Sequence, residues 1–183
     1  MRGKRMGLMR RRAWWILLLA VGLPAAQAAQ VCQADLAPQV VDARWQPLDA
    51  QRVRDKQTGL EWQRCSWGQT GPDCAQGQAQ RLTWPQSQEL IYRLNRQGWG
   101  EAQNWRLPTR AELLSLVRPG CLRPSIDLRV FPHTEALWFW SDDGGGVAGS
   151  DRQYVDFATG WPGEDDPQLA NAVRLVRRGP PAD

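Results

Sequence analysis

The first 28 residues constrain the fold most, because they decide which part of the chain folds and in which compartment. Residues 1–12 carry six basic side chains and no acid, and residues 13–23 form an apolar run that Pro24 ends. Small residues follow at Ala26 and Ala28, in the −3 and −1 positions of a cleavage site. This pattern is typical of a secretory signal peptide cleaved after Ala28. The alternative, an uncleaved anchor, needs roughly 20 apolar residues, about twice this run.

Loss of residues 1–28 reverses the charge of the protein. The whole chain has 23 bases, 19 acids and a net charge of +4. Six of those bases leave with the signal peptide, so 17 remain against 19 acids, and the remaining 155 residues carry −2. A slightly acidic exported domain is a poor partner for nucleic acid. We therefore expect a periplasmic or secreted protein with no nucleic-acid partner and no membrane span after cleavage.

Four cysteines follow the signal peptide, and an even number in an exported chain indicates two disulfides. Three pairings are available. Cys65 and Cys74 lie nine positions apart in a polar loop and form the natural local pair, which leaves Cys32 for Cys121. A zinc site is the alternative, but the chain has no Cys-x-x-Cys and its one histidine is His133.

Turn and capping signals divide the chain into short elements. Alternation on both sides of a Lys-Gln-Thr-Gly turn predicts a hairpin over residues 52–63. Thr83 and the Thr109–Glu112 capping box predict the starts of two helices, the first running to about Asn95. The order of elements predicts an α+β fold with two short helices between strands from both ends of the chain. The remaining expected segments are strands at 137–140, 153–157 and 172–177 and an acidic loop at 162–168.

Nine tryptophans remain after cleavage, and each either packs in the core or forms a binding platform. Apolar neighbours favour core positions for Trp138 and Trp140. We also expect Trp105 in the core, with Arg106 paired to an internal acid.

Four segments together resemble the Lcl C-terminal domain family, over roughly residues 50 to 178. The most specific is Trp-Arg-Leu-Pro-Thr-Arg-Ala-Glu-Leu at residues 105–113. The other three are residues 55–65, residues 139–141, and residues 154–160 with 173–177.

The resemblance implies an exported bacterial module with a disulfide-stapled, C-type lectin-like fold related to the formylglycine-generating enzyme. Together with the N-terminal pattern and the cysteines, it predicts a signal peptide (1–28), an N-terminal extension tied by a disulfide (29–50), the domain (51–178) and a disordered tail (179–183). The named member of the family is an adhesin that binds sulfated polysaccharide. The acidic character of the mature chain argues against sulfated glycans here.

A ligand site is expected from an exposed indole and a local arginine patch, because arginine suits bidentate contacts to acidic groups. Arg174 alternates with apolar Val173 and Leu175, as a solvent-facing residue does. A merely solvated strand face is the alternative. The candidate ligand-binding residues are Trp161, Arg174, Arg177 and Arg178.

Acidic loops form a candidate calcium site, since calcium takes several oxygen ligands from flexible loops. C-type lectin relatives use calcium in comparable loops. The chain lacks EF-hand spacing, and solvated loops are the alternative. We expect no other cofactor. The candidate ligands are Asp142, Asp143, Asp156, Glu164, Asp165 and Asp166.

The usual catalytic groups are scarce, with one histidine, four cysteines assigned to disulfides and no paired-carboxylate motif. We expect a non-catalytic module that binds a carbohydrate or another surface polymer, as an adhesion domain does. The alternative is a protein-interaction or structural module of the cell envelope with no glycan site. The expected partner is therefore a polysaccharide or an envelope protein, and the oligomeric state stays open.

Overall fold

The computed structural model describes residues 29–33, 43–143 and 150–180. The predicted signal peptide and the last three residues of the predicted tail lie outside these ranges. The helices are α1 (Trp84–Gln97) and α2 (Arg110–Leu114), with a 3-10 turn at Trp99–Glu101. The strands are β1 (Val31–Cys32), β2 (Trp45–Pro47), β3 (Arg52–Asp55), β4 (Leu60–Gln63), β5 (Gln69–Thr70), β6 (Gln76–Gly77), β7 (Arg81–Leu82), β8 (Cys121–Leu122), β9 (Trp138–Trp140), β10 (Arg152–Asp156), β11 (Trp161–Asp165), β12 (Asn171–Ala172) and β13 (Val176–Arg178).

The predicted hairpin is confirmed as β3 and β4, within a four-stranded antiparallel sheet of order β13-β4-β3-β2. Asp55 holds its turn by accepting hydrogen bonds from the Gln57 amide (3.0 Å) and the Thr58 hydroxyl (2.7 Å). Gly59 closes the turn at φ +71°, a conformation that glycine adopts without steric cost.

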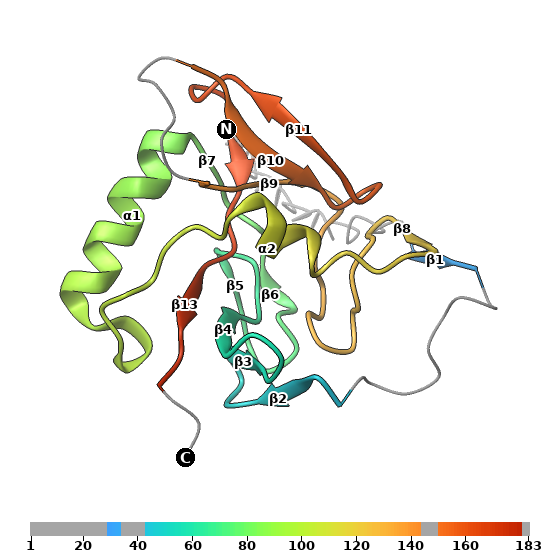
Figure 1. The fold of residues 1–183 in the computed structure, drawn as a ribbon, viewed down its shortest axis with the longest axis horizontal. Coiled ribbons are helices and arrows are strands. Elements are labelled where there is room, and N and C mark those ends of the chain that lie inside the picture. The colour runs from blue at the N-terminus through green and yellow to red at the C-terminus, as the bar shows by residue number, and fades with distance from the viewer. Residues whose placement is uncertain (1–28, 34–42, 144–149, 181–183) are drawn as a thin grey trace, which may run out of the picture.

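A five-stranded sheet of order β11-β10-β9-β12-β7 occupies the other end of the described fold (Figure 1). Its pairs are antiparallel except for β12 with β9. The prediction of an acidic loop over 162–168 is wrong for its first half, because β11 pairs along its whole length with β10. β11 is an edge strand, and an edge tolerates proline and charged side chains that resemble loop composition.

Both predicted helix starts are confirmed. Thr83 caps α1 in a capping box with Gln86, and Gly98 ends the helix at φ +66°. Thr109 caps α2 in the same way with Glu112. The described residues contain no helix that is long and apolar enough to cross a membrane.

The core has two clusters. One packs between the two sheets and is built around Trp62, Phe139 and Val155, while the other lies against α1 and includes Trp105 and Trp140. Trp105 and Trp140 are therefore core residues, as predicted.

The last predicted strand differs from the expected alternation, because residues 171–176 are all buried. β12 belongs to the five-stranded sheet and β13 to the four-stranded sheet, so residues 173–175 cross the interior between them. The expectation that Arg174 faces solvent is wrong for this reason, since a crossing segment has no solvent face.

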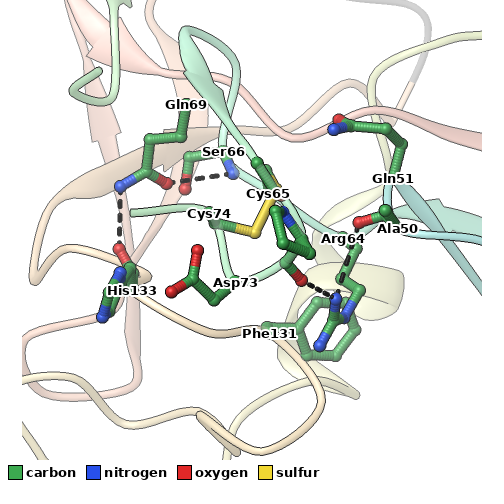
Figure 2. Close-up of a disulfide and its surroundings, with 12 residues drawn as sticks. Ala50, Gln51, Arg64, Cys65, Ser66, Gln69, Asp73, Cys74, Phe131 and His133 are labelled. Atoms are coloured by element: carbon green, nitrogen blue, oxygen red, sulfur yellow. Dashed lines mark hydrogen bonds between the residues drawn. A yellow bond between two sulfur atoms is a disulfide. The ribbon is translucent and has the colours of Figure 1, made fainter. Parts of the chain in front are cut away.

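Two disulfides tie the α+β fold, and both predicted pairings are present. Cys32 lies directly opposite Cys121 in the β1–β8 ladder, which ties the N-terminal extension to the middle of the chain. Cys65 pairs with Cys74 across a short loop, and both are fully buried (Figure 2).

Candidate ligand-binding face

The outer face of the five-stranded sheet carries exposed aromatic side chains. Successive residues of a strand point to opposite faces, so Phe139 enters the core while Trp138 points outward. Trp138 is 43% exposed, and its prediction as a core residue is wrong. Trp140 points to the same side as Trp138 but is covered, and its indole N–H donates to the Leu82 carbonyl at 2.7 Å.

Trp138 and Tyr154 form a stacked pair on this face. Their ring centroids are 4.5 Å apart and the planes differ by 3°. Tyr154 reaches over Gly163 on the next strand, where an added Cβ would lie 2.5 Å from the Cζ and Oη atoms of the phenol. Glycine is thus required at residue 163 for the phenol to lie there. Burial, with smaller contributions from the charges of Asp165 and Asp156, raises the pKa of Tyr154.

Trp161 extends the aromatic surface to the sheet edge. Its side chain is 75% exposed. In the strand register Trp161 of β11 lies opposite Asp156 of β10, and Asp156 also lies opposite Trp138 of β9. Directly paired residues point to the same face, so the three side chains form one row across β9, β10 and β11. We call the surface made by Trp138, Tyr154 and Trp161 the aromatic face. Of the residues predicted to bind a ligand, Trp161 is the one in this face.

A groove of about 720 Å³ adjoins Trp138. Leu169 and Ala170 form an apolar part of its wall, and Asn171 donates to Asp165 at 3.0 Å on the polar side. The sequence pattern missed most of this groove because β7 and β12 are two-residue strands without a readable alternation. Its lining residues are Arg81, Ala136, Leu137, Trp138, Asp165, Leu169, Ala170 and Asn171.

Arg174 is fully buried, so its prediction as a surface ligand contact is wrong. Its guanidinium donates to the carbonyls of Gln63 and Arg64 and to two hydroxyls, and it lies 4.8 Å from the ring centroid of Phe131. Burial lowers the pKa of Arg174 to about 9.

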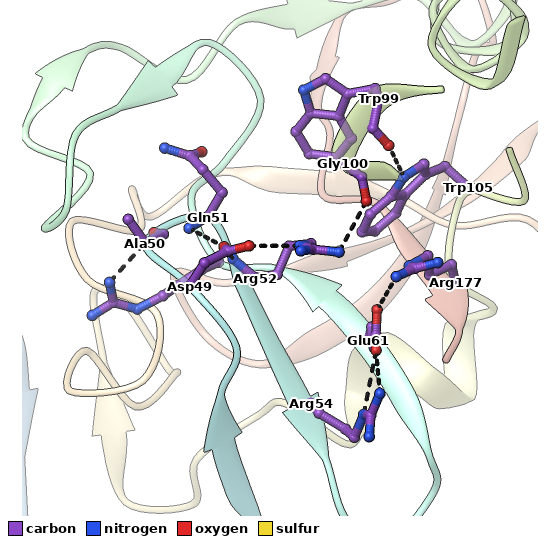
Figure 3. A network of polar contacts seen from close by, with 11 residues as sticks. Asp49, Ala50, Gln51, Arg52, Arg54, Glu61, Trp99, Gly100, Trp105 and Arg177 are labelled. Carbon is purple, nitrogen blue, oxygen red and sulfur yellow. Dashed lines mark hydrogen bonds and ion pairs between the residues drawn. The ribbon is translucent and has the colours of Figure 1, made fainter. Parts of the chain in front are cut away.

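Arg177 is also engaged within the fold. It pairs with one carboxylate oxygen of buried Glu61 at 2.5 Å, while Arg54 pairs with the other at 2.6 Å (Figure 3). Its guanidinium lies 5.4 Å from the ring centroid of Trp105. Of the three predicted arginines only Arg178 is exposed, so these three side chains do not form an exposed patch.

The six predicted calcium ligands do not form one cluster, although Asp142, Asp143 and Glu164 line one small pocket together with Asp151. Asp156 lies at the turn of the β10–β11 hairpin, where it accepts from the Ala158 amide and the Thr159 hydroxyl, whereas Glu164 and Asp165 lie toward the other end of β11. Asp143 also accepts from the Arg110 amide, and Asp166 accepts from the Gln168 amide. Across residues 29–33, 43–143 and 150–180, no three Asp, Glu, His or Cys side chains are grouped to hold a metal ion.

The family model of the Lcl C-terminal domain matches residues 51–177. The chain belongs to the Lcl C-terminal domain family. Among curated proteins, none matches this chain. The matched part of this Lcl C-terminal domain runs from β3 into β13 and includes the whole aromatic face. Strands β1 and β2 lie outside it, so the Cys32–Cys121 disulfide joins an extension to the family domain.

The most specific family segment is structural in this Lcl C-terminal domain. Trp105 is buried and donates its indole N–H to the Trp99 carbonyl at 2.8 Å. Arg106 pairs with Glu112, as the sequence predicted, and Thr109 caps α2. The segment therefore stabilises the fold, while the aromatic face lies on other strands.

Proposed function

We propose that this Lcl C-terminal domain is an exported, non-catalytic binding module that holds a carbohydrate or another surface polymer on its aromatic face. The observation that carries the proposal is the placement of Trp138, Tyr154 and Trp161 on one face of the sheet, with Trp161 three-quarters exposed. Adhesion to a polymer outside the cytoplasm is the corresponding biological role.

The chemistry of this face suits sugars. The C–H faces of a pyranose ring are apolar and pack on an indole, while its hydroxyls need donors and acceptors nearby. Aromatic surface with a few polar groups at its edge is the usual composition of a small-ligand site. Here the groove beside Trp138 supplies those groups from Arg81, Asp165 and Asn171.

The disulfides support two further parts of the proposal, export and a non-catalytic role. All four cysteines are in disulfides, which persist in oxidising compartments such as the periplasm or the medium. No thiol is therefore left as a nucleophile. The C-type lectin-like fold that the family resemblance implies is a further part of the proposal, because such a fold suits a binding module.

A glycan array with the processed chain, residues 29–183, tests the proposal. We expect binding that the Trp161→Ala variant weakens. Tyr92→Ala is the matched control, because Tyr92 is 57% exposed but lies on α1 and not on the sheet. An array with no bound glycan, or binding that both variants leave unchanged, would contradict the proposal.

The proposal includes no cofactor. The calcium prediction is checked by thermal melting with a chelator and with added calcium. A lower melting temperature in chelator would add calcium to the proposed module, and an unchanged melting temperature would count against it.

A protein-interaction module is the second candidate function, favoured by a different surface. Val31 of β1 and Leu122 of β8 lie directly opposite each other and are 64% and 49% exposed. Exposed apolar neighbours are common in protein interfaces. A photo-reactive residue at position 122 that captures one envelope protein, together with an empty glycan array, would favour this function.

A further inference from the structure

We infer that the polymer on the aromatic face is a neutral, extended chain of β-1,4-linked pyranoses that crosses strands β9, β10 and β11. This inference rests on the proposed function and adds the class of glycan. It comes from the row of Trp138, Asp156 and Trp161 and from the charges of the adjoining groove.

The row sets the shape of the ligand. Neighbouring strands lie about 4.8 Å apart, so the backbone positions of Trp138 and Trp161, two strands apart, are separated by about 10 Å. An extended β-1,4-linked chain is flat, turns every second sugar to the same side, and repeats over two sugar units at a similar distance. An α-1,4-linked chain is coiled, so it would contact a flat row of side chains at one position and then turn away from the protein surface.

The row of side chains ends at an edge of the five-stranded sheet. Trp161 stands on β11, the edge strand of the five-stranded sheet. Beyond it the described sheet has no further strand, so a polymer longer than the row continues past Trp161 without meeting another strand. A long chain rather than a single sugar is therefore the ligand that uses both indoles.

The charges set the electrostatic class of the ligand. The groove beside Trp138 is lined by one basic and one acidic side chain, Arg81 and Asp165, so its charges balance. Asp156 stands between the two tryptophans in the strand register, and its carboxylate, which accepts hydrogen bonds within the hairpin turn, adds negative charge near Tyr154 together with Asp165. A sulfated or uronic chain lying along the row would pass these two carboxylates, and like charges repel. A neutral chain avoids that repulsion.

The polar groups of the groove match the substituents of such a chain. The guanidinium of Arg81 donates hydrogen bonds, the carboxylate of Asp165 accepts them, and the amide of Asn171 does both. Hydroxyl and N-acetyl groups present the complementary donors and acceptors. Glucose and N-acetylglucosamine chains share this chemistry, and the test separates them.

Isothermal titration of the processed chain with four hexasaccharides tests the inference. The ligands are cellohexaose, N-acetylchitohexaose, maltohexaose and a sulfated heparin hexasaccharide. We expect at least one β-1,4-linked neutral ligand to bind more tightly than the other two classes, with an affinity that added salt leaves unchanged. Trp161→Ala should weaken that binding about tenfold, the usual effect of truncating an aromatic anchor.

Controls separate binding from folding. Trp161 is largely exposed, so its replacement should leave the melting temperature unchanged, and Tyr92→Ala should leave both affinity and melting temperature unchanged. Arg81→Gln, which alters an exposed side chain of the groove, is a second variant and should also weaken binding.

The failures of the two proposals are distinguishable. Tryptophan-dependent binding of maltohexaose or the heparin fragment, equal to or tighter than that of both β-1,4 ligands, would overturn the inference and leave the proposed function standing. No binding of any glycan would overturn both. Sedimentation that shows self-association abolished by Trp161→Ala would identify a second copy of the chain as the occupant and would also overturn both.

Discussion

Arg106 and Glu112 form a two-point ion pair, with both guanidinium–carboxylate distances at 2.7 Å. Glu112 also accepts from the Thr109 amide at 2.8 Å and so completes the capping box of α2. Arg106 in turn exchanges two backbone hydrogen bonds with Val176, the first residue of β13. One glutamate thus connects the start of a helix to the four-stranded sheet.

Replacement of Glu112 separates its two roles. Glu112→Ala removes the cap and the ion pair, and we expect a loss of about 2 kcal/mol in the free energy of unfolding. Glu112→Gln keeps a capping oxygen, so about half that loss is expected. Urea denaturation measures both, with Glu89→Ala on the exposed side of α1 as the control. A Glu112→Ala protein as stable as this control would show that the contact contributes nothing.

Stability should fall in acid because several carboxyls have lowered pKa values. Burial alone would raise the pKa of Asp55, but hydrogen bonds from Arg44 and Thr58 outweigh it and hold it below the usual range. The same balance, with Arg106 and Arg129 as the respective partners, lowers the pKa of Glu112 and Asp127.

A carboxyl with a lower pKa in the folded state stabilises the protein above its unfolded pKa. That contribution is lost as pH falls through the folded value. We therefore expect urea midpoints that are level near neutral pH and decline below about pH 4. Glu112→Gln should decline less steeply. A level midpoint down to about pH 2, where the usual carboxyl is protonated, would refute this prediction.

Arg174 should be the most sensitive of the C-terminal arginines to replacement. Arg174→Ala leaves the carbonyl oxygens of Gln63 and Arg64 without their donor and opens a cavity, and we expect a loss of at least about 3 kcal/mol. Arg174→Lys keeps a charge but not the planar fork, so an intermediate loss is expected. Arg178→Ala, on an exposed side chain, should change stability by less than about 0.5 kcal/mol. Equal losses at residues 174 and 178 would contradict the buried position of Arg174.

The two disulfides should differ in their contribution to stability. The chain-entropy model relates stabilisation to loop length, and the separations are 89 residues for Cys32–Cys121 and nine for Cys65–Cys74. Paired serine replacements should cost about 4–5 kcal/mol for the long loop and about 2–3 kcal/mol for the short one. Chemical denaturation measures the losses, and non-reducing mass spectrometry verifies the remaining disulfide. A larger loss from the short loop would mean that packing around buried Cys65 and Cys74 outweighs loop entropy.

Predictions from the sequence succeeded where a feature depends on interactions between residues that are close along the chain. The capping boxes of Thr83 and Thr109 join residues three positions apart, and the hairpin turn depends on four consecutive residues. Cys65 and Cys74 are close along the chain, and with four cysteines the second pair then follows. The ligand role of Trp161 stays a prediction, and the structure adds only that its side chain is exposed.

Predictions failed where burial depends on distant segments. Trp138 and Trp140 stand in the same apolar run, yet α1 and Leu82 cover only Trp140. Arg81 and Asn171 meet Trp138 in one groove because two-residue strands from distant parts of the chain pair beside β9.

The sequence by itself determined the two helix starts, the β3–β4 hairpin, the disulfide partners and the α+β class, because caps, turns and cysteine number act over short distances or by simple counting. The tertiary structure alone decided which side chains meet solvent. Arg174 and Trp161 show the difference, since a crossing between two sheets buries an arginine while an edge strand exposes an indole. Exposure depends on what packs against a residue from elsewhere in the chain, and no local pattern contains that information.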